Sequence, residues 1–334
     1  HFSVIRRFSD FVWLRERLDG EVPGCIIPPL PDKAVMGRFT PEFIQARRKQ
    51  LEKFLNRVAA HPELRGAPSF LTFLSAAEDA LAAAKATTTE APRQHRGFME
   101  WLSDTVGGVV GGGSASSGSK DAEDLAFEEI AQYLEGLEPQ LHAVQKHTAA
   151  LIKRRKEMAS ALFEFGLAFT VLGQNEGKDS LGEALRRLGL TADHLSVFAN
   201  KHAEAEGTFF EDPVRDYIRV VAAVKQALGH RGETQAALRN ALADLEAKRI
   251  TVTKLRGVAG RERALAEAEA AVTEAEASVA AVREKHTAIT DRVLTELERF
   301  KREKLADIKN VVLDYVQLQI DYNKKLEDAW NEPV

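Results

Sequence analysis

The stretch that decides the fold is residues 272–300, which read VTEAEASVAAVREKHTAITDRVLTELERF. Its apolar positions recur in steps of seven, three and four, and they are Val272, Val279, Val282, Ile289, Val293 and Phe300. Such steps place one apolar stripe along a helix, as in a coiled coil. The stretch therefore predicts a long helix that buries one face against neighbouring helices.

The same rhythm extends over most of the chain. It runs from Phe127 to Leu172, resumes from Phe210 to Leu245, and continues to Tyr322. Two glycine-containing breaks, one near residues 173–189 and one near 257–260, separate the runs. We expect helices at about residues 121–173, 192–248 and 260–330, with a kink in the second at Pro213 because proline disrupts helical hydrogen bonding.

Helices of about 50 to 70 residues would be roughly 75 to 100 Å long. The pattern therefore predicts an elongated, three-helix antiparallel coiled coil rather than a compact globule. One chain cannot cover every apolar seam of such a bundle, and antiparallel association of two chains would bury the remainder. We expect a dimer.

Residues 1–76 follow another pattern. A strand-like run opens the chain without Met, which predicts a piece of a longer protein, and a helix is expected from Asp10 to Leu18. A proline-rich segment, Ile27–Pro31, precedes a second helix that should run to about Ala60. Thr40 can cap this helix and Pro41 suits its first position. The expected class is a mixed α+β module with an incomplete sheet.

Residues 77–120 have the composition of a linker, rich in Ala, Thr, Gly and Ser. Within it, residues 97–106 place Phe98, Trp101 and Leu102 at helical spacing, which predicts a short amphipathic helix. That helix either docks on the protein or acts as a membrane wedge.

Composition excludes several classes. The formal net charge is -4, while residues 1–75 carry an excess of +4, with twelve Lys and Arg against eight Asp and Glu. Cys25 is the only cysteine, which excludes an intrachain disulfide framework and favours a reducing compartment. The sequence has no run of about 18 consecutive apolar residues, the length needed to span a bilayer. Nine histidines without metal-ligand spacing and the absence of a nucleophile motif predict no enzyme, no metal, no cofactor and no nucleic-acid partner.

Three N-terminal motifs carry a resemblance. The segments Arg6–Phe11, Pro28–Lys33 and Phe43–Arg48, followed by His61–Pro62, resemble the phox-homology (PX) domain of sorting nexins. The long helices, with the tract Glu206–Tyr217, are similar to the BAR domain that follows PX in one branch of that family. The resemblance implies a PX domain at 1–76 that lacks its first strands, and a BAR domain at 121–330 that forms a crescent-shaped dimer.

The resemblance also implies a headgroup site. In the family, residues matching Arg7 and Phe8 grip the 3-phosphate and pack on the inositol ring of phosphatidylinositol 3-phosphate. Lys33 matches the contact to the 1-phosphate, and Arg47 matches the contact to ring hydroxyls. Guanidinium groups bind phosphate oxygens in a charge-assisted, often bidentate way that lysine cannot fully copy.

Further membrane contacts are expected around this site and on the helices. Val35, Met36 and Phe39 match the family's membrane-inserting loop. Residues 246–263 carry a net charge of +4 at the turn between the last two helices, from Lys248, Arg249, Lys254, Arg256, Arg261 and Arg263 against two glutamates. Lys153 and Arg154 form a second basic surface, while Arg155 falls on the apolar register and should snorkel or pair in a dimer. A charge run of this kind can also serve solubility alone.

The function implied is that of a peripheral protein on the cytosolic face of endosomes, with the trans-Golgi network as a second location. It would bind phosphatidylinositol 3-phosphate, with the 3,5-bisphosphate as a second candidate, and would pair with itself or with another sorting nexin. It would tubulate or sense curved membrane during retrograde sorting with the retromer trimer. The alternative is a dimeric coiled-coil scaffold whose PX remnant binds no lipid.

Overall fold

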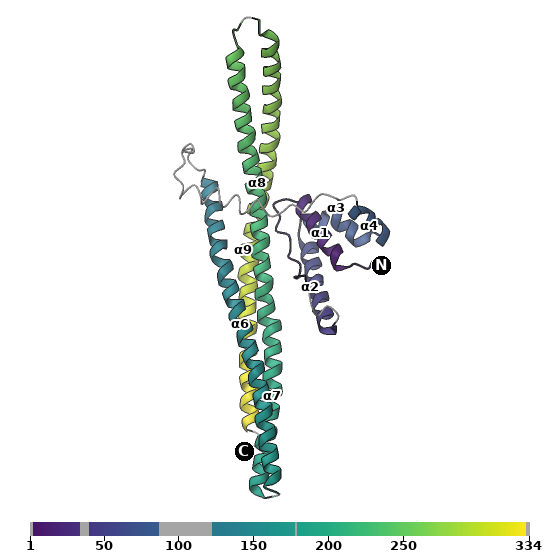
Figure 1. Cartoon of the computed structure of the whole chain (residues 1–334), viewed down its shortest axis with the longest axis vertical. Helices are drawn as coiled ribbons and strands as arrows, with labels where there is room; N and C mark the ends of the chain where they lie inside the picture. The colour runs from purple at the N-terminus through teal and green to yellow at the C-terminus, as the bar shows by residue number, and fades with distance from the viewer. Residues whose placement is uncertain (1–2, 34–39, 87–121, 178, 259, 332–334) are drawn as a thin grey trace. The chain divides into compact units, whose positions relative to one another are not determined.

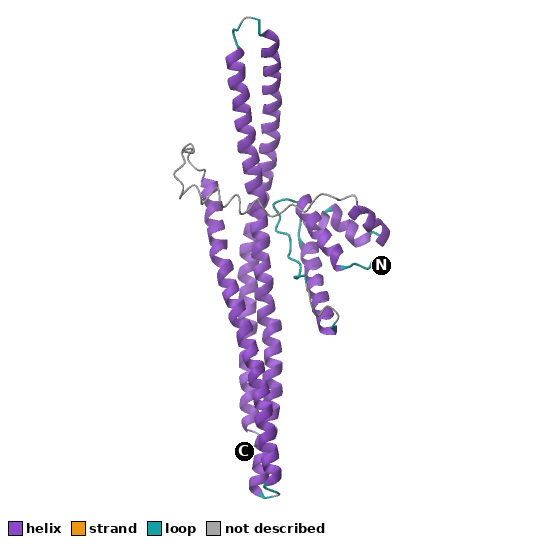
Figure 2. Cartoon of the chain, in the orientation of Figure 1, coloured by secondary structure: helices purple, strands orange, loops and turns teal. Residues whose placement is uncertain are grey.

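The computed structural model describes residues 3–33, 40–86, 122–177, 179–258 and 260–331, and within these ranges every regular element is helical (Figure 2). The chain divides into two compact units. Figure 1 colours the chain by residue number. Unit 1 comprises His1–Ala131 and Val220–Phe300, and unit 2 comprises Gln132–Arg219 and Lys301–Val334.

Unit 1 begins with an N-terminal module of short helices, residues 3–86. Its elements are α1 (Phe8–Glu21), α2 (Pro41–Ala60), the 3₁₀ turn η1 (Leu64–Gly66), α3 (Pro68–Ser75) and α4 (Glu78–Ala86). Helix α2 begins as predicted, since the Thr40 hydroxyl accepts the Phe43 amide at 3.3 Å and Pro41 occupies the first turn. Helix α1 is longer than predicted because the Asp10 carboxylate accepts the Arg7 amide at 2.7 Å, which starts the helix at Phe8.

The core of this module is aromatic. The Phe11 ring meets the Phe73 ring edge-on, with centroids 4.9 Å apart, and lies 6.2 Å from the Phe54 ring. Leu14 and Leu18 of α1 are fully buried beside them. Each such side chain contributes about 1.5–3 kcal/mol when it leaves water, so α1, α2 and α3 are held together chiefly by apolar burial.

The predicted β-sheet is not confirmed. Within the described part of the module, the segment before α1 is extended but has no paired strand. A strand needs a neighbour to satisfy its main-chain N–H and C=O groups. Here the Arg6 side chain ties the segment to α3 instead, donating to the carbonyls of Phe73 at 2.7 Å and Ala76 at 2.6 Å.

Four long helices make up the rest of the chain: α6 (Ala122–Asn175), α7 (Ser180–Glu206), α8 (Asp212–Leu255) and α9 (Glu262–Asn331). Within unit 1, α8 and α9 form an antiparallel hairpin (Figure 1). Its turn contains Gly257 and Gly260 at positive φ, 83° and 81°, conformations that favour glycine.

The start of α6 is anchored in unit 1 by a buried arginine. Arg231 of α8 is 3% exposed, lies 2.5 Å from the Asp124 carboxylate, and stacks 3.9 Å from the centre of the Phe127 ring. A buried guanidinium is tolerated only when it is paired, so Asp124 and Phe127 fix the first turns of α6 against α8.

In unit 2, α7 starts at Ser180, earlier than the predicted residue 192, after the Asp179 carboxylate caps it by accepting the Gly182 amide at 2.7 Å. The prediction was wrong because it treated the glycines as a break. Gly182 and Gly189 lie inside α7, where the missing side chain allows close approach to α6. A Cβ on Gly189 would lie 2.7 Å from the Gly166 carbonyl oxygen.

Helices α7 and α8 are joined by a π-helical turn, η2 (Gly207–Glu211), which ends two residues before Pro213. Proline has no N–H group, so the ordinary hydrogen-bond ladder loses a donor here. The Asp212 amide binds the Gly207 carbonyl, five residues back, instead of four. The sequence predicted a kink at Pro213, and the structure shows a widened turn just before it.

Candidate functional site

The predicted headgroup residues converge on Arg47 of α2. Its guanidinium lies 4.7 Å from the centre of the Phe8 ring at the start of α1 and 5.0 Å from that of Phe43. The same group donates to the main-chain carbonyls of Pro31, at 3.3 Å, and Asp32, at 2.7 Å. The proline-rich segment, α1 and α2 are thereby brought to one place.

The other two predicted residues border this place. Lys33 is exposed and follows Asp32, whose carbonyl Arg47 binds. Arg7 precedes Phe8, but its side chain turns to Glu78 of α4 at 2.9 Å. Both members of that pair are more than 70% exposed, so solvent screens the attraction and the pair contributes little to stability. A ligand phosphate could compete with Glu78 for Arg7.

The predicted membrane-inserting residues lie outside the described residues. They are Val35, Met36 and Phe39 in the loop before α2, and Phe98, Trp101 and Leu102 in the expected amphipathic helix. Both groups remain predictions.

The basic turn of the α8–α9 hairpin is partly neutralised by carboxylates that the helices bring to it. Four of its six predicted cations have an acidic partner, at 2.7, 2.7, 3.8 and 3.0 Å: Lys248 with Asp244, Arg249 with Glu276, Arg256 with Glu269, and Arg263 with Glu267. Lys254 and Arg261 are exposed. The charge of the turn is lower than the sequence predicted because all four of these carboxylates lie outside residues 246–263.

The second basic surface behaves differently. Lys153 and Arg154 are exposed on α6, with Lys153 3.9 Å from Glu157. Arg155 pairs with Glu206 of the same chain, with Nε and Oε2 2.8 Å apart. Its snorkelling or pairing in a dimer stays a prediction. A buried carboxylate inside unit 2 competes for the guanidinium more effectively than water.

We call Arg155, Glu206, His202 and Gln319 the Glu206 cluster. Glu206 is fully buried, and it accepts a hydrogen bond from the Gln319 amide at 2.7 Å and lies 3.4 Å from His202 Nε2. Burial and the Arg155 charge lower the pKa of His202, while the Glu206 carboxylate acts in the opposite direction. His202 also stacks on Tyr322, with centroids 4.0 Å apart.

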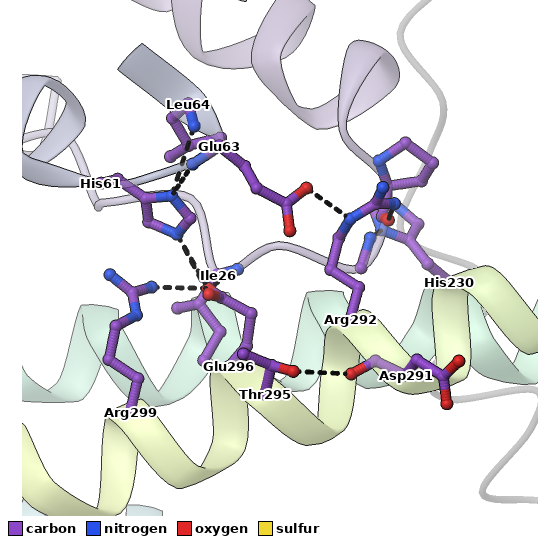
Figure 3. A network of polar contacts seen from close by, with 12 residues as sticks. Ile26, His61, Glu63, Leu64, His230, Asp291, Arg292, Thr295, Glu296 and Arg299 are labelled. Atoms are coloured by element: carbon purple, nitrogen blue, oxygen red, sulfur yellow. Dashed lines mark hydrogen bonds and ion pairs between the residues drawn. The ribbon is translucent and has the colours of Figure 1, made fainter. Parts of the chain in front are cut away.

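A second buried glutamate lies in unit 1, and Figure 3 shows its surroundings. Glu296 of α9 is 4% exposed and accepts from His61 Nε2 at 3.1 Å, from the Ile26 amide at 2.9 Å and from Arg299 at 2.5 Å. We call these four residues the Glu296 cluster. Burial alone would raise the pKa of Glu296, but the hydrogen bonds from His61 and Ile26 and the Arg299 charge hold it below its usual value.

Cys25, His61 and Glu296 lie close enough to suggest a metal site, with their ligand atoms within 4.8 Å of one another. The hydrogen bonds argue against it. His61 Nδ1 accepts the amides of Glu63 and Leu64 at 3.2 and 3.3 Å, so Nε2 carries the ring proton and donates it to Glu296. Burial raises the pKa of the Cys25 thiol to about 12, with Glu296 and Glu63 adding to the effect. The group is a hydrogen-bonded junction.

The sequence contains a signal for both glutamates that the predicted site residues did not include. Glu296 follows Val282 and Ile289 at seven-residue spacing, and Glu206 follows Ala192 and Ala199 in the same way. A charged residue on an apolar heptad position is expected to be buried and therefore to need partners.

Comparisons with known proteins agree with this architecture. The family model described as PX domain matches residues 1–77, and the model described as Vps5 C terminal like matches residues 104–333. Sorting nexin 1 of Arabidopsis thaliana is 31% identical over 98% of this chain and 81% of its own length. Sorting nexin-2 and sorting nexin-1 of Bos taurus are each 28% identical over 98% and 99% of this chain, but this chain spans only 64% of their length.

A solved structure described as the SNX-BAR Mvp1 tetramer has a TM-score of 0.62 at 18% identity, covering 99% of this chain and 89% of that one. This likeness supports the fold. The chain is therefore a two-part protein with a PX domain and a BAR-like helical region. It belongs to the sorting nexins, whose members are peripheral membrane trafficking proteins rather than enzymes. None of the described helices has the length and apolar character needed to cross a membrane.

Proposed function

We propose that this chain binds phosphatidylinositol 3-phosphate on endosomal membrane and acts there in retrograde sorting with retromer. The observation that carries the proposal is the convergence of Phe8, Arg47 and the main chain before Lys33 at one exposed edge of the N-terminal module. A guanidinium held between an aromatic ring and two carbonyls is positioned before any ligand arrives, which lowers the cost of binding.

Arg7 supplies the phosphate contact in this proposal. Its present partner, Glu78, lies on an exposed surface, where an ion pair contributes about 0–1 kcal/mol. A phosphomonoester offers more negative charge and more acceptor oxygens than one carboxylate. Lipid binding would therefore exchange a weak intramolecular partner for a stronger one.

Dimerisation through unit 2 forms the second part of the proposal. Large apolar side chains on its three helices are exposed, among them Leu167, Leu190, Leu305 and Leu313, at 55%, 58%, 73% and 54%. We infer that a second chain covers them, since large exposed apolar patches mark interaction sites. Two copies would place two headgroup sites on one particle, so that avidity sets membrane residence. Sedimentation equilibrium should give about twice the chain mass.

One observation favours the alternative, a dimeric scaffold whose N-terminal module binds no lipid. Arg7 is already paired with Glu78, and a scaffold needs nothing more of it. In that case the exposed apolar surface of unit 2 would recruit a partner chain, and substitution of Arg7 would leave membrane association unchanged.

Vesicle co-sedimentation separates the two proposals. Phosphatidylcholine vesicles carrying phosphatidylinositol 3-phosphate, the 3,5-bisphosphate or unphosphorylated phosphatidylinositol are incubated with wild type, Arg7→Ala, Arg7→Lys and Arg65→Ala. Arg65 is an exposed arginine of the same module and serves as the charge-matched control. We expect 3-phosphate-dependent pelleting that Arg7→Ala removes, Arg7→Lys weakens and Arg65→Ala retains. Equal pelleting of all four proteins would favour the scaffold.

A further inference from the structure

Residues 23–26, between α1 and the proline-rich segment, form a loop whose main chain is bound by the side chains of α8 and α9. The Pro23 carbonyl accepts from Arg292 at 2.8 Å, and the Gly24 amide donates to His230 Nδ1 at 3.0 Å. The Ile26 amide donates to Glu296 at 2.9 Å. We call residues 23–26 the docking loop.

Main-chain polar groups that are buried must find partners, because each unpaired group loses its hydrogen bond to water without replacement. Gly24, Cys25 and Ile26 are buried. The Cys25 amide donates to the Val22 carbonyl of the module itself, at 3.2 Å. The partners of Pro23, Gly24 and Ile26 come from the long helices, two from α9 and one from α8. These three main-chain groups are therefore satisfied only when the module lies against these helices.

Gly24 adds a steric requirement. Its φ of +92° is a conformation that glycine adopts readily and other residues rarely do. A Cβ at this position would also lie 3.2 Å from the Ile289 carbonyl oxygen and from the Val293 side chain. A side chain at this position would therefore require the loop or α9 to shift by a few tenths of an ångström.

Around the loop, polar and charged side chains make further contacts between the module and the long helices. Arg292 also pairs with Glu63 at 2.7 Å, and His230 lies 3.4 Å from Asp19. Arg15 donates to Gln226 at 2.9 Å. These contacts come from α1, from Glu63 just before η1, and from both long helices, so the attachment extends beyond the docking loop.

We propose that the docking loop and the Glu296 cluster form a latch that fixes the N-terminal module on the α8–α9 hairpin, with Glu296 as the residue on which the latch depends. The latch gives the module one position on the hairpin. Buried polar groups are suited to this role because they tolerate few alternative arrangements.

A consequence for membrane binding follows, and it rests on the function proposed above. If the module binds a headgroup, the latch transmits the orientation of that headgroup site to the hairpin. The helices would then meet the membrane at an angle that the lipid site determines.

Hydrogen exchange followed by mass spectrometry tests the latch directly in the whole chain and without lipid. The Gly24 and Ile26 amides should be strongly protected in the wild type. In Glu296→Ala their exchange should become about 100-fold faster, because removal of one partner leaves the others buried and unpaired. Protection of Leu51–Val58 in α2 should change little, which would show that the module remains folded.

Glu284→Ala is the matched control, since Glu284 is an exposed glutamate of the same helix. It should leave the exchange of residues 23–26 at the wild-type rate. Unchanged protection of the docking loop in Glu296→Ala would overturn the latch.

If Glu296→Ala loses protection throughout unit 1, the milder variant Arg292→Gln tests the latch instead. Arg292 is half-buried and contacts Pro23 and Glu63, so its replacement should speed exchange of the loop by about tenfold and leave α2 protected. No change in this milder variant would refute the proposal. Because no lipid is present, either result is independent of whether the module binds phosphoinositides.

Discussion

The two buried glutamates of this chain occupy equivalent heptad positions but have partners of different kinds. In the Glu206 cluster of unit 2, the partners are side chains, from Arg155, Gln319 and His202. In the Glu296 cluster of unit 1, one partner is the main-chain amide of Ile26. A side-chain partner can be replaced by substitution, whereas a main-chain amide cannot. The helix bundle of unit 2 could therefore do without the charge of Glu206, whereas the docked N-terminal module of unit 1 requires that of Glu296.

Substitution of each glutamate tests this difference most directly. Glu206→Ala should lower the free energy of unfolding of unit 2 by about 3–5 kcal/mol, because Arg155 is left largely buried without its partner. Native-state hydrogen exchange of α6 and α7 amides at fixed protein concentration measures this. Glu204→Ala, an exposed neighbour on α7, should cost less than about 0.5 kcal/mol.

The double variants then distinguish the two clusters. Arg155→Leu with Glu206→Leu should recover most of the loss, since well-packed apolar residues can replace a buried ion pair. His61→Leu with Glu296→Leu should not recover the stability that unit 1 loses in Glu296→Ala. The amides of Ile26, Glu63 and Leu64 would remain without acceptors. Equal recovery in both units would show that the distinction between side-chain and main-chain partners has no energetic meaning here.

Glycine substitutions in unit 2 test whether close packing, as well as charge, fixes the bundle. Gly189→Ala should destabilise unit 2 by about 1–3 kcal/mol, since its Cβ would meet the Gly166 carbonyl and the Thr170 hydroxyl. Gly136→Ala, on α6 with nothing within 4 Å, should stabilise it by about 0.5–1 kcal/mol through helix propensity. Thermal unfolding of the two variants at one protein concentration measures the difference, and a loss in both would contradict the assignment of Gly189 to a close contact.

Acidification should affect the two clusters in different pH ranges. Burial lowers the pKa of His202, so the folded state binds fewer protons than the unfolded state, and stability falls as pH drops below the ordinary histidine value of 6.5. The pKa of Glu296 is lowered, so its contribution is lost only as pH falls below the ordinary glutamate value of 4.5. His202→Gln should therefore reduce the pH slope of unit 2 stability, by at most about 1.4 kcal/mol per pH unit. The measurement is urea unfolding from about pH 7 to about pH 5; an unchanged slope would remove His202 from the explanation.

Local signals in the sequence predicted the long helices and the start of α2. The heptad spacing through Val279 and Ile289 requires a buried helical face, and Thr40 with Pro41 specifies a helix start. These signals depend on neighbours within a few residues, so no knowledge of tertiary contacts was needed. The same reasoning failed at Gly182 and Gly189, because a glycine that breaks a helix and one that admits a neighbouring helix look alike in sequence.

The polar clusters could be predicted only in part. Heptad position marks Glu296 as buried, but its partners His61 and Ile26 lie 235 and 270 residues away. No local pattern specifies which distant donor will arrive at a buried carboxylate. Family resemblance predicted Phe8 and Arg47 as headgroup residues, whereas the pairing of Arg7 with Glu78 depends on where α4 packs.

The π-helical turn η2 also accommodates a change in the spacing of buried positions along the chain. Deeply buried positions follow one another every seven residues up to η2 and every seven residues after it, but the interval across η2 is eight, as shown by Ala192, Ala199, Glu206, Val214 and Val221. In an unbroken α-helix, one extra residue would rotate everything downstream by about 100°. The widened turn absorbs that rotation, so an insertion that would have turned the buried stripe toward solvent leaves it facing inward. Alignments of this helix with relatives that lack the extra residue should accordingly place their gap within residues 207–211, where the backbone accommodates it.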